Sequence, residues 1–331
     1  MHNPARYVKD PQLLKSLDTI TDVFGDGSFY TMDYFSGDRL DRILSEDHHS
    51  VDDFKVLLAK VFVTEEMNRM DFGACCSAFT AKDKRGHVLV GRNFDFTHPL
   101  FGILLRTASP GELRTIGMAD MSFSDMKPGS LTDGKTDITT AVTVPYFNMD
   151  GMNEAGLFIG VLQLNKATTA QDSGKRKVIT TSMIRAVLDR AKTVEEAEII
   201  FRSYDMQSPI ADKDYHFFTA DASGASRVFE YVDNVLNVID TDLVTNFYLS
   251  KGMRKKGGGK ERYAVLKELL NYREGRMEKK DMMDALRLVS QPSGSKGKSD
   301  TLWSAVYDLT AKEVTVVTDH RYSKAKTYKI L

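Results

Sequence analysis

Apolar residues recur at helical spacing through the first 75 positions of the chain. One stripe, at residues 13–20, follows Asp10 and Pro11, an N-cap residue and a proline suited to a first helical turn. A second stripe, at residues 54–62, follows Ser50, which has an acidic residue three positions later as in a capping box. The pattern predicts that residues 1–75 are helical and pack on the body of the protein.

From residue 76 onward, short strand patterns alternate with pairs of helical patterns. The expected order is strands at 76–81, 87–90, 103–107, 113–118, 138–144 and 156–164, helices at 179–192 and 193–203, strands at 215–220, 226–232, 235–239 and 243–248, helices at 261–272 and 279–289, and strands at 301–309 and 313–319. Runs of strands broken by helix pairs favour a layered α+β fold over a parallel βαβ series.

Length and charge exclude several classes of partner. The 331 residues can bury a substantial core in one large domain or two modest ones. The 45 basic and 46 acidic residues leave a formal net charge of −1, which gives no field that would favour nucleic acid or an anionic membrane. No apolar run is long enough to span a bilayer, and residues 1–10 lack a signal-peptide pattern, so we expect a cytoplasmic protein without stable membrane insertion.

Two polar segments could suggest ligand sites and are given simpler interpretations. His48 and His49 follow an aspartate, but they stand just before a capped helix and are interpreted as a solvated loop, not a metal site. The glycine- and lysine-rich run at residues 251–260 lacks the residue order of a phosphate loop. It is interpreted as a flexible solvated loop, with a rim that attracts an acidic leaving group as the alternative.

The only two cysteines, Cys75 and Cys76, are neighbours in the sequence. A disulfide between adjacent residues is strained, so a reactive thiol becomes the interesting possibility beside an inert buried one. If residues 76–81 and 87–90 belong to one hairpin, Arg92 and Asp95 return to the vicinity of Cys76. A guanidinium beside a thiol lowers the thiol pKa from about 8.5 and favours the thiolate. No Cys–His pairing pattern supplies a base.

The segment that starts at Cys76 and contains the motif Gly-Arg-Asn-Phe-Asp resembles the start of mature choloylglycine hydrolases and penicillin V acylases. Arg92 lies sixteen residues after Cys76 and Asp95 three residues later, which is the spacing of that family. The run Asp-Gly-Met-Asn-Glu-Ala-Gly-Leu at residues 150–157 is similar to the family's loop-into-strand signature.

The resemblance continues toward the C-terminus with one departure. Asn246 matches an asparagine that donates to the oxyanion, and Arg262 matches a second active-site arginine. Gln163 stands where bile-salt hydrolases carry an asparagine and some penicillin acylases a tyrosine. Glutamine keeps an amide donor but adds a methylene, which weakens an assignment to bile salts.

The resemblance implies the four-layer αββα sandwich of the N-terminal-nucleophile hydrolases. In such enzymes the α-amine of the cysteine is the base, so the bond between Cys75 and Cys76 must break first, through attack of the Cys76 thiol on the preceding carbonyl. Residues 1–75 then form a helical pro-segment that is cleaved, and its retention is left open. Residues 76–331 form the catalytic domain. The pro-segment is similar to those of isopenicillin-N acyltransferases and acid-ceramidase-like amidases.

The implied reaction is hydrolysis of a linear, non-peptide amide in a small N-acyl substrate, with no metal or organic cofactor. Cys76 attacks and Arg92 holds the thiolate, whereas Asp95 orients the α-ammonium. Asn246 and Gln163 bind the oxyanion. The family also suggests a homo-oligomer. Two alternatives remain open, namely transfer of the acyl group to an amine and a non-catalytic binding protein on the same fold.

Overall fold

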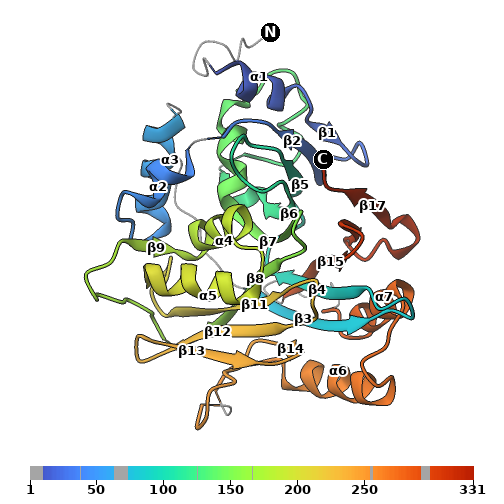
Figure 1. Ribbon diagram of the computed structural model, residues 1–331. Coiled ribbons are helices and arrows are strands. Elements are labelled where there is room, and N and C mark those ends of the chain that lie inside the picture. The colour runs from blue at the N-terminus through green and yellow to red at the C-terminus, as the bar shows by residue number, and fades with distance from the viewer. Residues whose placement is uncertain are drawn as a thin grey trace.

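Two large β-sheets face one another in the computed structural model, and helices lie on their outer surfaces (Figure 1). The structure describes residues 10–37, 39–62, 74–124, 126–165, 167–253, 256–291 and 299–331. This arrangement is the four-layer α+β order that the resemblance implied.

The larger sheet has nine strands, whose order across the sheet follows the chain. They are β1 (Thr21–Asp22), β2 (Phe29–Tyr34), β5 (Gly102–Thr107), β6 (Thr115–Asp120), β7 (Asn148–Asn153), β8 (Phe158–Asn165), β11 (Lys213–Ala220), β12 (Ser226–Val232) and β13 (Val235–Asp240). Neighbouring strands are antiparallel except β2 and β5, which are parallel.

The smaller sheet has six strands and contains Cys76. Across the sheet they are β14 (Leu243–Val244), β3 (Ala74–Lys82), β4 (Val88–Phe96), β15 (Asp300–Asp308), β16 (Glu313–Thr318) and β17 (Lys326–Lys329). Every residue of β4 is buried, because this central strand is covered on both faces.

Helix pairs cover the outer faces of both sheets. The larger sheet is covered by α4 (Thr180–Arg190) and α5 (Val194–Ser203), and the smaller by α6 (Lys260–Tyr272) and α7 (Lys279–Leu288). A two-stranded parallel pair and three 3₁₀ helices complete this part: β9 (Lys177–Ile179), β10 (Asp205–Gln207), η2 (Met121–Ser124), η3 (Thr139–Phe147) and η4 (Tyr322–Lys324). The predicted cap of α5 is confirmed, since the Thr193 side chain accepts the Glu196 N–H.

The N-terminal segment is only partly helical, which corrects the prediction for residues 1–75. It contains α1 (Pro11–Leu17), α2 (Leu40–Leu44) and α3 (Val51–Phe62), and Asp10 caps α1 as expected. The strand β2 was missed. Its aromatic-rich sequence suits a strand, and it is hydrogen-bonded beside β5 inside the large sheet. The rest of the predicted pro-segment, at 1–9, 38 and 63–73, lies outside the described residues.

Polar and aromatic contacts join the N-terminal segment to the body of the protein. Asp33 on β2 accepts two hydrogen bonds from Arg106 on β5, at 2.7 and 2.8 Å. His48, predicted to be solvated, is instead fully buried, and its Nε2 lies 2.8 Å from the Ser182 hydroxyl on α4. Burial lowers the pKa of His48 to about 4, so the ring is neutral near pH 7. Phe54 packs edge-on against Phe147.

Two strand predictions were wrong. Residues 138–144 were predicted to be a strand, but η3 occupies this position. The Asp137 carboxylate accepts the Thr139 N–H at its start, and Pro145, inside it, has no N–H to offer a strand partner. Residues 243–248 were predicted to be a strand, but only Leu243–Val244 are one.

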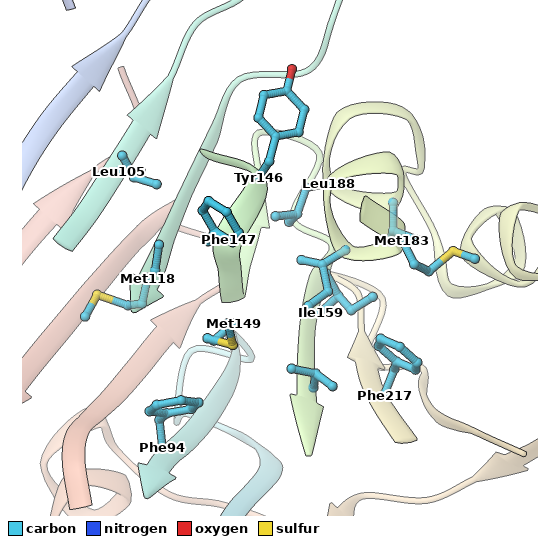
Figure 2. Packing of buried hydrophobic residues seen from close by; sticks show 14 of the residues in the cluster. Phe94, Leu105, Met118, Tyr146, Phe147, Met149, Ile159, Met183, Leu188 and Phe217 are labelled. Carbon is cyan, nitrogen blue, oxygen red and sulfur yellow. The ribbon is translucent and has the colours of Figure 1, made fainter. Parts of the chain in front are cut away.

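The main apolar core lies between the sheets and continues beneath α4. Figure 2 shows Met149 between Phe147 and Phe94, with Leu188 of α4 between Phe147 and Ile159 and Met183 of α4 beyond Ile159. Phe94 belongs to the smaller sheet and Ile159 to the larger, so one core joins both sheets. Cys76 belongs to this core.

Candidate active site

The register of the β3–β4 hairpin decides which side chains meet around Cys76. Cys76 pairs with Phe94, and Ala78 pairs with Arg92. Side chains alternate between the two faces of a sheet, so Cys76, Arg92 and Phe94 share one face. Asp95 lies on the other. We call these the inner face, toward the nine-stranded sheet, and the outer face, toward α6 and α7. The predicted hairpin is confirmed, and its two charged residues are on opposite faces.

The inner face holds the thiol together with a buried cation. Cys76 and Arg92 are both fully buried. Arg92 donates from Nη2 to the Val161 carbonyl at 2.6 Å and from Nε to the Asp150 carboxylate at 3.2 Å. Burial alone would lower the pKa of Arg92, but the adjacent Cys76 thiol and Asp150 carboxylate raise it. The guanidinium is therefore a fixed positive charge beside the sulfur.

Asp150 fixes Arg92 and was not assigned a role from sequence. Besides Arg92, its carboxylate accepts hydrogen bonds from Trp303 Nε1 at 3.1 Å and from the Tyr307 hydroxyl at 2.5 Å. Burial raises the pKa of Asp150, whereas Arg92 and these donors work against that rise. The signal for this residue was present, because Asp150 opens the signature at residues 150–157.

The outer face is organised by Arg262, the third residue of α6. Its Nη1 donates to the Cys76 carbonyl at 2.7 Å, to the Ser77 hydroxyl at 2.8 Å and to Asp95 Oδ2 at 3.3 Å. Its Nη2 donates to Asn246 Oδ1 at 2.8 Å. Arg262 therefore contacts the backbone of residue 76, whereas Arg92 lies beside its side chain.

Asp95 is fully buried beneath the start of the hairpin. The Thr301 hydroxyl donates to its Oδ1 at 2.6 Å, and Arg262 lies at its Oδ2. Burial raises the pKa of Asp95 to about 6 even though Arg262, Thr301 and Arg92 lower it. Thr301, like Ser77, is a contributor that sequence reasoning did not identify.

Asn246 connects the backbone of Cys76 to the larger sheet. Its Oδ1 accepts the Cys76 backbone N–H at 2.5 Å, and its Nδ2 donates to the Gln163 carbonyl at 2.8 Å. An amide nitrogen carries two hydrogens, so one N–H of Asn246 is available beyond this contact. Gln163 is buried on β8 and its side chain lines a neighbouring pocket. All six residues predicted for the site are thus brought together by the structure.

The glycines before α6 contact Asn246 and Arg262, which gives the loop a packing role that the sequence did not indicate. Gly257 and Gly258 are exposed, as expected of a solvated loop. Gly258 donates its N–H to the Asn246 carbonyl at 2.8 Å. Gly259 has φ +74°, and a Cβ there would lie 2.6 Å from Arg262 Nη2. Gly257 has φ +100°, and a Cβ there would lie 2.3 Å from the Asn246 carbonyl oxygen. The glycine run permits close packing on the site.

An apolar pocket opens beside the inner face of the hairpin. Its cavity volume is about 30 Å³, and the recess reaches about 520 Å³ only when the open solvent at its mouth is included. Phe94 and Val161 form the wall nearest to Cys76 and Arg92, and α3 contributes Val51. The described residues contain no group of three or more histidine, cysteine or acidic side chains that could hold a metal ion. None of the helices within the described ranges has the length and apolar composition of a membrane span.

Comparisons with known proteins agree with this geometry. The family model of linear amide C–N hydrolases, choloylglycine hydrolase family, matches residues 76–247, more than half of the chain, and the match begins at Cys76. No curated protein sequence matches the chain.

Solved structures share the fold. Two variants of a conjugated bile acid hydrolase from Clostridium perfringens each give a TM-score of 0.58 at 15% identity, covering 77% of this chain and 92% of theirs. A penicillin V acylase from Agrobacterium tumefaciens gives a TM-score of 0.54 at 18% identity, covering 74% of this chain and 83% of its own. The chain therefore belongs to the choloylglycine hydrolase family, and it is an amidohydrolase that acts on C–N bonds of linear amides other than peptide bonds.

Proposed function

We propose that Cys76 is the nucleophile of this amidohydrolase and that it acts as an N-terminal residue after the chain cuts itself at the Cys75–Cys76 bond. The observation that carries the proposal is that both the side chain and the backbone of residue 76 have charged or polar partners. Arg92 lies beside its thiol on the inner face, while Asn246 and Arg262 bind its backbone N–H and carbonyl. An inert buried thiol does not require this set of charged partners.

Self-cleavage follows an N-to-S acyl shift. The Cys76 sulfur loses its proton and attacks the Cys75 carbonyl, the C–N bond breaks, and the Cys76 nitrogen takes a proton. Water then hydrolyses the thioester, which releases the Cys75 carboxylate and returns the Cys76 thiol beside a free α-amine. The fixed charge of Arg92 stabilises the thiolate that starts this sequence.

The mature site uses the new α-amine as the base. An α-amine has a pKa of about 7.7–8.0, so it accepts the thiol proton near neutral pH and passes it to the leaving amine. The side chain of Asn246, already bonded to the residue 76 nitrogen, holds this amine, and Asp95, which shares Arg262 with the Cys76 carbonyl, orients it. The second N–H of Asn246 and the side-chain amide of Gln163 bind the oxyanion.

The N-terminal segment stays bound after cleavage. Strand β2 forms a ladder with β5, and residues of α1, β2, α2 and α3 belong to the main apolar core. Removing them would expose that core, at a cost of about 25 cal/mol for each Å² of apolar surface. Val51 of α3 also lines the pocket, so the retained segment completes the substrate site.

Intact mass and activity of cysteine variants test the nucleophile. Wild type is expected to give fragments of 75 and 331 − 75 = 256 residues and to hydrolyse N-acyl amides. Cys76→Ala should give one uncut chain without activity, and Cys76→Ser should cut slowly because a hydroxyl is a weaker nucleophile. Cys75→Ala is the matched control and should still be cut. An active, uncut Cys76→Ala protein refutes the proposal. Acyl transfer is tested separately: candidate amine acceptors are added, and mass spectrometry of the products shows whether the free acid or a new amide forms.

Gel filtration of the cut protein tests retention. The two fragments are expected to elute together and to separate only under denaturing conditions. A cut protein that elutes without its N-terminal fragment and keeps full activity would show that the segment is dispensable.

A further inference from the structure

The pocket beside Cys76 has an apolar body. Aromatic rings from β4, η2 and η3 form most of its wall, together with Met149, Val161 and Pro209. Figure 2 shows three of these side chains, Phe147, Met149 and Phe94, along one side. Such a wall suits the carbon chain or ring of an acyl group.

Three hydroxyl-bearing residues, Thr180, Thr181 and Tyr215, interrupt this wall. Thr181 and Tyr215 both line the pocket, and each residue is only 8% exposed. Within the described residues, neither Thr181 Oγ1 nor the Tyr215 hydroxyl has a hydrogen-bond partner. A buried hydroxyl without a partner costs stability, so two in one pocket indicate that something else satisfies them.

The first turn of α4 faces the same place. Ile179, the N-cap residue, and Thr180 line the pocket, and no side chain caps the helix at Ile179. The opening N–H groups of a helix have no partner within the helix and carry a partial positive charge. Thr181 lies in this turn, so its hydroxyl group and the backbone N–H donors belong to the same part of the pocket wall.

We infer that the pocket takes an acyl group that is mostly apolar and carries one neutral oxygen acceptor, such as a ketone, bound by Thr181, Tyr215 and the first turn of α4; this rests on the proposed function of Cys76. Hydroxyl and backbone N–H groups all donate. Burial and the nearby Asp214 raise the pKa of Tyr215, which keeps its proton in place. None of the described residues that line the pocket is charged, so a carboxylate bound there would be desolvated without a counter-ion from the wall.

A substrate ladder tests the inference on the purified, self-cleaved protein. Fluorogenic amides of straight-chain acids are compared with keto analogues in which the carbonyl is moved along the chain, and with analogues that end in a carboxylate. At one keto position, kcat/KM is expected to exceed that of the plain chain by about tenfold. Thr181→Val and Tyr215→Phe should each reduce this advantage by about threefold to tenfold.

Matched controls come from the same chain. Thr318 and Tyr231 are also buried and have hydroxyl groups without partners in the described part of the chain, but they lie outside the pocket. Thr318→Val and Tyr231→Phe should leave the keto advantage unchanged.

Several results would overturn the inference while leaving the nucleophile in place. One is Cys76-dependent hydrolysis with no preferred keto position. Another is a keto preference that Thr181→Val and Tyr215→Phe do not alter. Preference for the terminal carboxylate overturns the assignment to a neutral acceptor. If no amide is hydrolysed, or if Cys76→Ala hydrolyses them equally well, the proposed function itself fails.

Discussion

The two faces of the β3–β4 hairpin treat residue 76 in different ways. On the inner face the thiol lies beside Arg92, whose position is fixed by Asp150 and by the Val161 carbonyl. On the outer face, Arg262 contacts the backbone carbonyl of Cys76. Each face has one arginine and one buried carboxylate. The arginine of the inner face lies beside the sulfur of residue 76, whereas that of the outer face contacts its main chain.

Under the proposed function, this difference would let one residue serve as nucleophile and as base. A cysteine in this role needs its side chain ionised and its nitrogen held in place, and the alternation of a β-strand separates these tasks by a sheet's thickness. The two charge networks are then bonded to different atoms of residue 76, although Arg92 still lowers the pKa of Asp95 across the sheet. Substitutions on one face should therefore change sulfur chemistry, and substitutions on the other should change the handling of the nitrogen.

The largest effect is expected from Arg92→Met on the inner face. Loss of the cation should raise the thiol pKa by about 1–3 units and lower activity near pH 7 by up to about a thousandfold. The measurement is the pH dependence of Cys76 alkylation by mass spectrometry, in a Cys75→Ala background where Cys76 is the only thiol. An alkylation profile that does not change would show that Arg92 does not stabilise the thiolate.

Asn246→Ala removes the amide that bonds to the residue 76 nitrogen. We expect kcat to fall by about a hundredfold, since a lost oxyanion donor typically has this effect, and self-cleavage to slow. The alkylation profile of Cys76 should stay close to that of wild type. An alkylation profile shifted as far as in Arg92→Met would show that Asn246 acts on the thiol rather than on the residue 76 nitrogen.

Arg262→Gln tests the outer face with a smaller change. Glutamine keeps a donor but loses the charge beside Asp95, so activity should fall by about tenfold while the thiol pKa holds. Self-cleavage rates from intact mass and alkylation rates are measured on the same preparation. Equal shifts of the thiol pKa in Arg92→Met and Arg262→Gln would show that both arginines influence the thiol to the same extent.

The smallest effect concerns pH and stability through Asp95. Its folded pKa of about 6 lies above the ordinary aspartate value, so the folded state binds its proton more tightly. The resulting stability is present below about pH 4 and is lost as pH rises through about 6, by up to about 3 kcal/mol. Urea unfolding of uncut Cys76→Ala across this range should show the fall, and adding Asp95→Asn should remove it. An identical fall in both proteins would assign it to other groups.

Local patterns predicted much of this molecule. The hairpin, the caps of α1 and α5 and the spacing of Cys76, Arg92 and Asp95 depend on short-range rules, and the structure confirms them. The order of strands and helix pairs also indicated the layered fold.

The wrong strand at residues 138–144 has a local cause in Asp137 and Pro145, whereas other features that the sequence did not indicate depend on partners distant in the chain. Strand β2 owes its conformation to β5, more than seventy residues later. The role of Asp150 appears only when Trp303 and Tyr307 reach it from β15. The close packing of the glycines at residues 257–259 against Asn246 and Arg262 could likewise not be predicted from the loop sequence. The hydrophobic periodicity within one segment carries no information about contacts with distant segments.

The position of β2 has a consequence for the life of the protein. While the backbone is continuous, β2 meets β5 as part of the same chain, with the probability of a single molecule closing a loop. If the bond before Cys76 is cut as proposed, the same encounter needs two separate polypeptides at their actual concentrations. After full denaturation, a protein matured in this way should regain activity only slowly, at a rate that falls as the two fragments are diluted.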